Sequence, residues 1–177
     1  MAYGVSGWFD VATEARVRSV WGALHAEGLC SVLHEGPYRP HVTFGVYEEM
    51  DVEALRAELG AFAGGVAPLE CKLAYAGLFN NEPPVLFLAM TLSPATLNLH
   101  FEIHGRMAKH GAGAKPYCLP GRWNPHCTLS PAIDQETLPK AWALVQKAEL
   151  PIVGRIDRLG LVDTPAEVEL GALPLGG

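Results

Sequence analysis

The strongest constraint on how this chain folds is a short sequence that occurs twice. Residues 40–43 read Pro-His-Val-Thr, and residues 125–128, 85 positions later, read Pro-His-Cys-Thr. The flanking residues match at the same offset: Gly36 with Gly121, Tyr38 with Trp123 and Pro40 with Pro125. Roughly 0.3 His-x-Thr patterns are expected by chance in a chain of this composition, so a single copy would carry little information. Two copies with matched flanks indicate an internal repeat and a site built from both copies.

Each copy of the motif is expected to open a β-strand. Successive side chains of a strand alternate between its two faces, so His41 and Thr43 point the same way, as do His126 and Thr128. The apolar residue between them points into the core. Each copy therefore presents one imidazole and one hydroxyl side by side on one face of a sheet.

The elements around the motifs follow the same order in both halves: strand, helix, His-x-Thr strand, helix, strand. Asp10 is expected to cap the first helix, and the segment 80–84, Asn-Asn-Glu-Pro-Pro, separates the halves. Hydrophobic periodicity and turn residues predict strands at 2–9, 41–47, 69–79, 85–92, 126–130, 152–162 and about 166–172, and helices at about 12–27, 51–62, 94–110 and 136–149.

This order predicts an α+β fold in a single domain, residues 1–177, with lobe-level repeats at about 1–80 and 85–177. We expect a duplicated, two-lobed architecture in which two antiparallel sheets, flanked by helices, surround a central cleft with pseudo-two-fold symmetry. Such packing would bring both His-x-Thr strands to the same cleft.

Composition limits the class of protein and of ligand. Of the 177 residues, 49% are hydrophobic and 18% are charged, and no apolar run is as long as a membrane span, which is typical of a soluble globular protein. The formal net charge of −6 argues against extended duplex nucleic acid and favours a small nucleotide or a short RNA end as the partner. The first residues lack the pattern of a secretory signal, so we expect a cytoplasmic protein. We also expect a monomer without a membrane partner.

The four cysteines, Cys30, Cys71, Cys118 and Cys127, form no Cys-x-x-Cys pair and do not have the spacing of a metal finger. We therefore expect reduced and mostly buried thiols.

Two histidines that face one cleft suit acid–base chemistry at phosphorus. The unperturbed pKa of histidine, about 6.5, allows one neutral imidazole to remove a proton while one protonated imidazole donates a proton to the departing alkoxide. The threonine hydroxyls suit the donation of hydrogen bonds to the non-bridging phosphate oxygens. This scheme requires no metal or other cofactor, and the roles of the two histidines reverse with the direction of the reaction.

The paired motifs in a duplicated chain resemble the 2H phosphoesterase superfamily, which includes the 2′-5′ RNA ligase-like proteins and the 2′,3′-cyclic nucleotide phosphodiesterases. The resemblance covers essentially the whole chain and is specific at the motifs. It implies metal-independent chemistry on 2′,3′-cyclic phosphates, 2′-5′ linkages or related phosphoesters. Carried over residue by residue, it implies that His41 and His126 are the acid–base pair and that Thr43 and Thr128 bind phosphate.

Residues next to the motifs are weaker candidates for substrate binding. Tyr38 and Trp123 each precede a motif histidine by three residues, where an aromatic ring either stacks on a base or packs the loop. Arg39 and Arg122 are the nearest permanent cations and are candidates to meet phosphate. In a regular strand, Tyr47 would share the face of the first motif and line the cleft.

The remaining histidines are assigned structural roles. His100 and His104 have the i, i+4 spacing of metal ligands on a predicted helix, but their sequence is not His-Glu-x-x-His and a third ligand is not evident. We therefore expect a partly exposed helix face.

The glycine-rich segment 111–121 is predicted to be a loop, and it lacks the pattern of a phosphate-binding loop.

Two alternatives to a metal-independent enzyme stay open. The first is a nucleotide-binding module of the same fold without turnover, although a binder would not need two matched acid–base groups. The second is a metal hydrolase that uses His41, His126 and the helix histidines; neither motif strand carries an accompanying carboxylate, and insensitivity to chelators would eliminate this reading.

Overall fold

The order of elements agrees with the duplicated pattern. The computed structural model describes residues 2–164 and 168–177. Along the chain the elements are β1 (Tyr3–Phe9), α1 (Val11–Ala26), α2 (Val32–Glu35), β2 (His41–Met50), α3 (Val52–Ala63), β3 (Leu69–Phe79), β4 (Val85–Met90), α4 (Pro94–His110), β5 (Gly111–Ala114), the 3₁₀ turn η1 (Pro116–Cys118), β6 (His126–Ser130), α5 (Leu138–Val145), β7 (Ile152–Asp163) and β8 (Val168–Pro174). The bounds predicted for β3, α4 and β6 are confirmed.

Three segments differ from the prediction. The connection before β2 contains the short α2, and α5 is shorter than the predicted helix at 136–149. The glycine-rich segment contains β5 and η1 because the backbone of β5 pairs with the edge of β2, from Tyr47–Ala114 to Met50–Gly111, and this pairing outweighs the low strand propensity of glycine and alanine. Residues 166 and 167 of the predicted last strand lie outside the described residues.

The strands form one continuous antiparallel sheet, not two. Its order is β5-β2-β1-β7-β3-β4-β6, and β8 pairs with the C-terminal half of β7, from Arg158 to Asp163. The prediction of two sheets is wrong because β3 and β7 pair with each other between Leu69–Ile156 and Leu73–Ile152. The order β2-β1-β7 is mirrored by β6-β4-β3, so the expected pseudo-two-fold axis passes between the two central strands.

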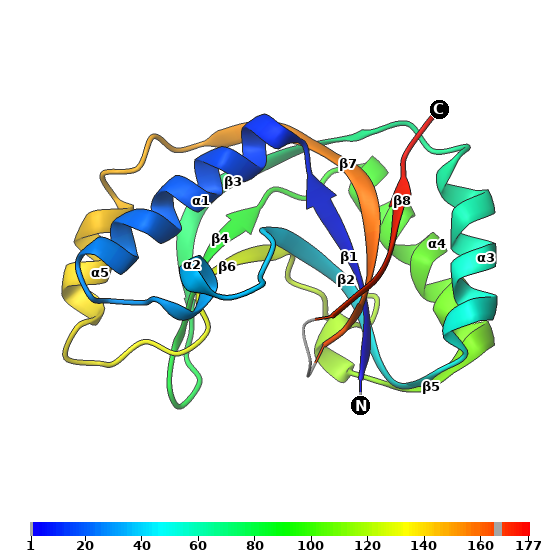
Figure 1. Ribbon diagram of the computed structural model, residues 1–177, viewed down its shortest axis with the longest axis horizontal. Helices are drawn as coiled ribbons and strands as arrows, with labels where there is room; N and C mark the ends of the chain where they lie inside the picture. Colours follow the sequence, from blue (N-terminus) through cyan, green and yellow to red (C-terminus); the bar gives the residue numbers. More distant parts are fainter. Residues whose placement is uncertain (1, 165–167) are drawn as a thin grey trace.

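The sequence repeats exchange their last strands. β7, which follows the second motif, pairs with β1 of the first half, while β3, which follows the first motif, pairs with β4 of the second half. Figure 1 shows the resulting sheet curling between two groups of helices. The curl brings β2 and β6, which are far apart in strand order, into contact with each other.

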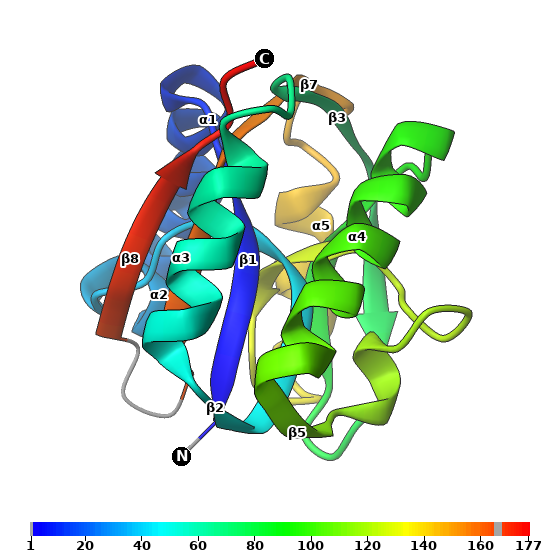
Figure 2. The same cartoon turned by 90° about the vertical axis from the view of Figure 1, so that its right-hand side faces the viewer.

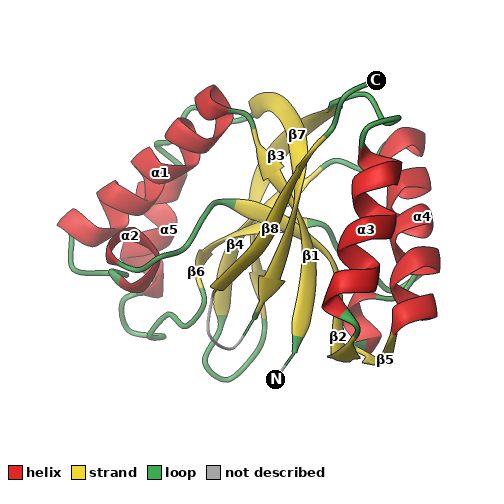
Figure 3. Cartoon of the chain, turned by 45° about the vertical axis from the view of Figure 1, so that its right-hand side comes forward, coloured by secondary structure: helices red, strands yellow, loops and turns green. Residues whose placement is uncertain are grey.

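Helices cover the sheet in two groups. Figures 2 and 3 show α3 and α4 side by side on one side of the molecule, whereas α1, α2 and α5 gather on the opposite side. Within residues 2–164 and 168–177, none of the helices combines the length and the apolar character needed to cross a membrane.

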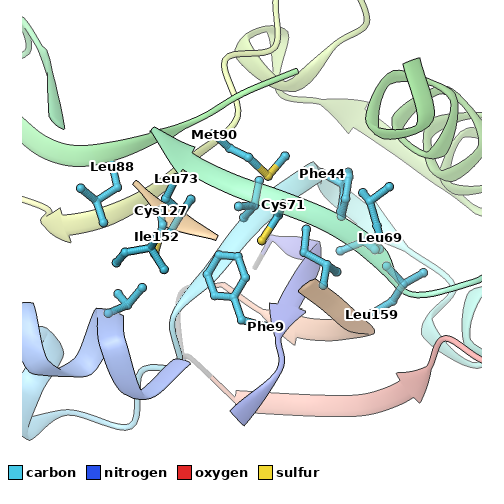
Figure 4. Packing of buried hydrophobic residues seen from close by; sticks show 14 of the residues in the cluster. Phe9, Phe44, Leu69, Cys71, Leu73, Leu88, Met90, Cys127, Ile152 and Leu159 are labelled. Carbon is cyan, nitrogen blue, oxygen red and sulfur yellow. The ribbon is translucent and has the colours of Figure 1, made fainter. Parts of the chain in front are cut away.

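The hydrophobic core is continuous between the two halves. Figure 4 shows residues of both halves in one packed cluster, with Phe9 and Phe44 from the first half and Leu88 and Cys127 from the second. All four cysteines are free thiols and three of them are buried, which confirms the expectation from their spacing. Burial raises the pKa of the Cys127 thiol to about 12, so this thiol stays protonated at neutral pH.

Asp10 caps α1, as predicted, and also joins the helix to the sheet. Its Oδ1 accepts a hydrogen bond from the Thr13 backbone N–H at 2.8 Å, and its Oδ2 accepts one from the Arg155 N–H at 2.8 Å. One carboxylate therefore satisfies a free donor at the helix N-terminus and another on β7.

Replacement of this cap tests its contribution to stability. We expect Asp10→Ala to lower the free energy of unfolding by about 1–2 kcal/mol, because two backbone donors lose their acceptor. Urea denaturation measures the change. Asp51→Ala is the matched control, since Asp51 caps α3 through one bond, to the Ala54 N–H. An equal or larger loss in Asp51→Ala would contradict the second role of Asp10.

Candidate active site

The two His-x-Thr motifs meet where β2 and β6 come into contact. His41 and His126 open these two strands, and both side chains are half-buried. Cys127, the middle residue of the second motif, is buried, and its thiol interacts with the backbone N–H of His41. The curl of the sheet therefore places two motifs, 85 residues apart in sequence, in one site.

Both histidines are held by the same local hydrogen bond. His41 Nδ1 lies 2.7 Å from the carbonyl oxygen of Arg39, and His126 Nδ1 lies 2.7 Å from that of Asn124. A carbonyl only accepts, so Nδ1 carries the proton in both rings. Nε2 of each ring is then left to act as an acceptor when neutral and as a donor when protonated.

A β-bulge follows the threonine of each motif. On β2, Thr43 pairs with Ser6 and Gly45 pairs with Val5, so Phe44 is an extra residue. On β6, the extra residue is Leu129, at the same place after its motif. Bulges often occur beside active sites, where they redirect side chains.

The bulge on β2 explains why Tyr47 does not line the cleft as expected. One extra residue reverses the alternation of faces, so Val46 shares the face of Thr43 and borders the cavity. Tyr47 is buried instead, and its hydroxyl hydrogen-bonds Nδ1 of His104 at 3.3 Å.

Two tryptophans hold the backbone of the motifs. Trp123 Nε1 donates to the carbonyl of Thr43 at 2.8 Å, and Trp21 Nε1 donates to the carbonyl of Thr128 at 3.0 Å. Trp123 lies in the loop before β6 and Trp21 lies in α1, so each motif is held by an indole from the other half of the chain. Sequence reasoning assigned Trp21 no role in the site.

Two cavities meet at Thr43. The larger has a volume of about 380 Å³ and lies beside His126, with Phe79, Asn81 and Trp123 in its wall. Its size is in the range of small-molecule sites. The smaller, of about 80 Å³, lies beside His41, and Trp8, Ser6 and Arg39 are among the residues that line it. The site is therefore roomy on the side of one motif and narrow on the side of the other.

The surroundings of the two histidines lower their pKa values. Burial lowers the pKa of His126, which packs against Phe79 at 4.7 Å and Phe87 at 5.2 Å between ring centroids. Burial also lowers the pKa of His41, and the charge of protonated His126 lowers it further. Both imidazoles therefore favour the neutral state more than an exposed histidine does.

The flanking candidates divide into two groups. Trp123 and Arg39 border the cavities, although the Arg39 Nε also binds Glu14 Oε2 at 2.9 Å and its guanidinium lies over the Trp8 ring at 4.8 Å. Tyr38 and Arg122 line neither cavity. The Tyr38 ring packs over Gly36 and against the core, and Arg122 is exposed.

His100 and His104 are buried, with exposed fractions of 1% and 5%, so the prediction of a partly exposed helix face is wrong. The face of α4 that carries them packs against β2 and does not face solvent. Their Nε2 atoms bind the backbone carbonyls of Cys118 at 2.9 Å and Phe44 at 3.0 Å. Among residues 2–164 and 168–177, no group of three or more His, Cys, Asp or Glu side chains is arranged to hold a metal ion.

Sequence reasoning missed several residues of the site. Trp8 and Phe79 each come at or near the end of a strand, next to a histidine in space and far from it in sequence. Asn81 was interpreted only as part of the segment that separates the halves, but it lines the larger cavity. Loop residues often contribute to binding sites.

Comparison with known proteins gives one family and several solved structures. Residues 46–167 match the family model of the 2′-5′ RNA ligase superfamily, a range that includes the second motif and begins just after the first. No curated protein matches the chain. LigT of Escherichia coli, complexed with 3′-AMP, aligns with a TM-score of 0.64 at 17% identity, over 99% of this chain and 98% of that one.

Two further structures share the fold. TT0787 of Thermus thermophilus aligns with a TM-score of 0.60 at 18% identity, over 100% of this chain and 99% of that one. Usb1 of Kluyveromyces marxianus, with uridine monophosphate, aligns with a TM-score of 0.50 at 14% identity, over 99% and 97%. At these identities the likeness is one of fold, and it extends over the whole length of the chains compared.

Four histidines, two buried and two half-buried, are expected to make stability depend on pH. Burial lowers the pKa values of His41, His100, His104 and His126 in the folded protein. In the unfolded chain these groups titrate near pH 6.5, so the unfolded state binds more protons as the pH falls through that value. The free energy of unfolding should therefore decrease between pH 7.5 and 5.5, by at most about 1.4 kcal/mol for each of these histidines, because each takes up at most one proton more in the unfolded state.

Thermal unfolding at a series of pH values measures this dependence. His100→Gln removes one of the four titrating groups, so the decrease should be smaller in that variant. Carboxylates titrate at lower pH and do not dominate this interval. A melting temperature that is constant or rises on acidification would contradict the prediction.

Proposed function

The chain belongs to the 2′-5′ RNA ligase superfamily, and on that premise we propose that it is a metal-independent phosphoesterase that acts on 2′,3′-cyclic phosphates or 2′-5′ linkages of nucleotides and RNA ends. The observation that carries the proposal is the matched setting of His41 and His126. Each donates its Nδ1–H to the carbonyl two residues earlier. This leaves two Nε2 atoms, from two strands, free to exchange protons with a substrate.

In the proposed reaction, one neutral histidine removes a proton from water as the water oxygen bonds to phosphorus. The other, protonated, donates its proton to the ribose oxygen as the phosphorus–oxygen bond of the ring breaks. Water and cyclic phosphate together give one nucleoside monophosphate, and the two histidines exchange protons with solvent before the next cycle. The hydroxyls of Thr43 and Thr128 donate hydrogen bonds to the non-bridging oxygens, whose charge grows in the transition state.

The cavities favour a cyclic phosphate over a linkage between two nucleosides. The larger, of about 380 Å³, offers the ring of Trp123 and the amide of Asn81 to a base and lies beside His126. The smaller, of about 80 Å³, has room for water and phosphate oxygens rather than for a second nucleoside. The nucleotides bound to LigT and Usb1 agree with a small nucleotide as the ligand.

Phosphorus NMR with each 2′,3′-cyclic nucleotide, in the presence of EDTA, tests the proposal directly. We expect conversion to a single monophosphate isomer, and we expect His41→Ala and His126→Ala each to abolish it, because each removes one of the two proton carriers. The variants should remain folded, since both side chains are half-buried and not in the core.

The matched control is His110→Ala, which removes a histidine that binds Glu58 away from the site. Near-wild-type turnover in either motif variant would refute the acid–base assignment. A shifted phosphorus signal without turnover would identify a nucleotide-binding module, and activity lost only on chelation would identify a metal hydrolase.

The pH dependence of turnover follows from the lowered pKa values of both histidines. The free enzyme is active when one histidine is neutral and the other is protonated, so kcat/KM should be bell-shaped with its optimum below pH 6.5. Bound phosphate favours the protonated imidazoles, so the profile of kcat should lie at higher pH. Initial rates between pH 4.5 and 8.5 measure both profiles. An optimum of kcat/KM at pH 7.5 or above would contradict this prediction.

A further inference from the structure

Two adjacent backbone carbonyls of β2 are held by side chains from the second half of the chain. The bulge leaves Phe44 without a paired residue on β1, and its carbonyl accepts a hydrogen bond from His104 Nε2 at 3.0 Å. The preceding carbonyl, of Thr43, accepts one from Trp123 Nε1 at 2.8 Å. Unpaired carbonyls at a buried bulge are costly, and here both have a donor.

His100 holds the indole that binds Thr43. Its ring is stacked on Trp123 with 4.0 Å between centroids and 5° between planes. His100 Nε2 is itself fixed, 2.9 Å from the carbonyl of Cys118. The Trp123 ring also lies 5.4 Å from Phe44, so it has contacts on more than one side. The direction of its N–H therefore depends on the position of α4.

α4 packs directly against the bulge because β2 carries no side chain at Gly45. A Cβ at that residue would lie 2.7 Å from Met107 Sδ and 3.2 Å from His104 Nε2. His104 is further oriented by Tyr47, whose hydroxyl faces His104 Nδ1 at 3.3 Å. A small shift of α4 would thus be transmitted to the backbone of Phe44 and, through Trp123, to that of Thr43.

We propose that His100 and His104 are positioning residues of the site, which hold the bulged segment Thr43–Phe44 so that the Thr43 hydroxyl and the His41 imidazole face the substrate. Neither side chain lines the cavities described above; both act through the backbone of β2 and through Trp123. The proposal rests on the proposed function for its catalytic consequence, but the hydrogen bonds that it concerns exist in the free protein.

His104→Phe and His104→Gln separate positioning from packing. Phe fills the space but removes the donor to the Phe44 carbonyl, whereas Gln keeps an N–H at similar reach. We expect His104→Phe to lower kcat by about 10- to 100-fold with little change in KM, since small misplacements of reacting groups have effects of this size. His104→Gln should recover most of kcat. His110→Gln, at the last residue of the same helix, is the matched control.

A spectroscopic measurement tests the same contacts without substrate. In the ¹⁵N-labelled protein, the Trp123 indole N–H resonance, assigned through Trp123→Phe, reports the hydrogen bond to Thr43. We expect His100→Ala to move this resonance upfield and to accelerate its exchange with solvent by about tenfold, because the stacked ring is lost. If His104→Phe does not fold, the indole resonance in His100→Ala decides on the positioning role by itself.

The outcomes distinguish this proposal from the proposed function. If the wild-type protein converts no cyclic nucleotide, the proposed function fails, and the indole resonance alone decides on positioning. The positioning role is refuted if folded His104→Phe keeps the wild-type kcat, if His104→Gln is as impaired as His104→Phe, or if the indole resonance does not change in His100→Ala.

Discussion

The pairing of β3 with β7 is the contact on which the rest of the architecture depends. Each of these strands crosses from its own sequence repeat into the other half of the sheet, and their shared ladder runs from Leu69–Ile156 to Leu73–Ile152. All four of these side chains are buried, so the ladder is covered by core on its inner face. Because the ladder makes the sheet continuous, the relative position of β2 and β6 is set by the curl of one sheet and not by the packing of two. The site is a consequence of that curl.

Within this frame, each motif depends on side chains of the other repeat. Trp21 of the first half binds Thr128, and Trp123 and His104 of the second half bind Thr43 and Phe44. These donors satisfy carbonyls next to the two bulges, where a regular ladder is interrupted. Neither half therefore completes its own motif strand, because each needs hydrogen-bond donors from the other half.

Much of this arrangement was predictable from the sequence, and the missing part has a common cause. The repeated Pro-His-x-Thr and the helical periodicities are local signals, and they predicted the element order, the Asp10 cap and the meeting of the two motifs. The single sheet, the strand status of residues 111–114 and the burial of His100 depend on contacts between distant segments. The face predicted for Tyr47 was wrong for a different reason. A bulge of one residue reverses the face of every later residue in the strand, and the composition of the strand does not reveal it.

The two copies have kept the same local geometry and differ in what surrounds it. The Nδ1 hydrogen bonds, the bulges and the indole donors match in both, whereas Phe79 and Phe87 flank His126 alone, and buried histidines back β2 alone. A symmetric pair of proton carriers has no preferred direction by itself. The cavity on the side of His126 is larger than the one on the side of His41, and in the proposed reaction this asymmetry would orient a nucleotide across the pair. In the proposed reaction, direction would therefore come from the residues that differ between the two surroundings, and proton transfer from those that match.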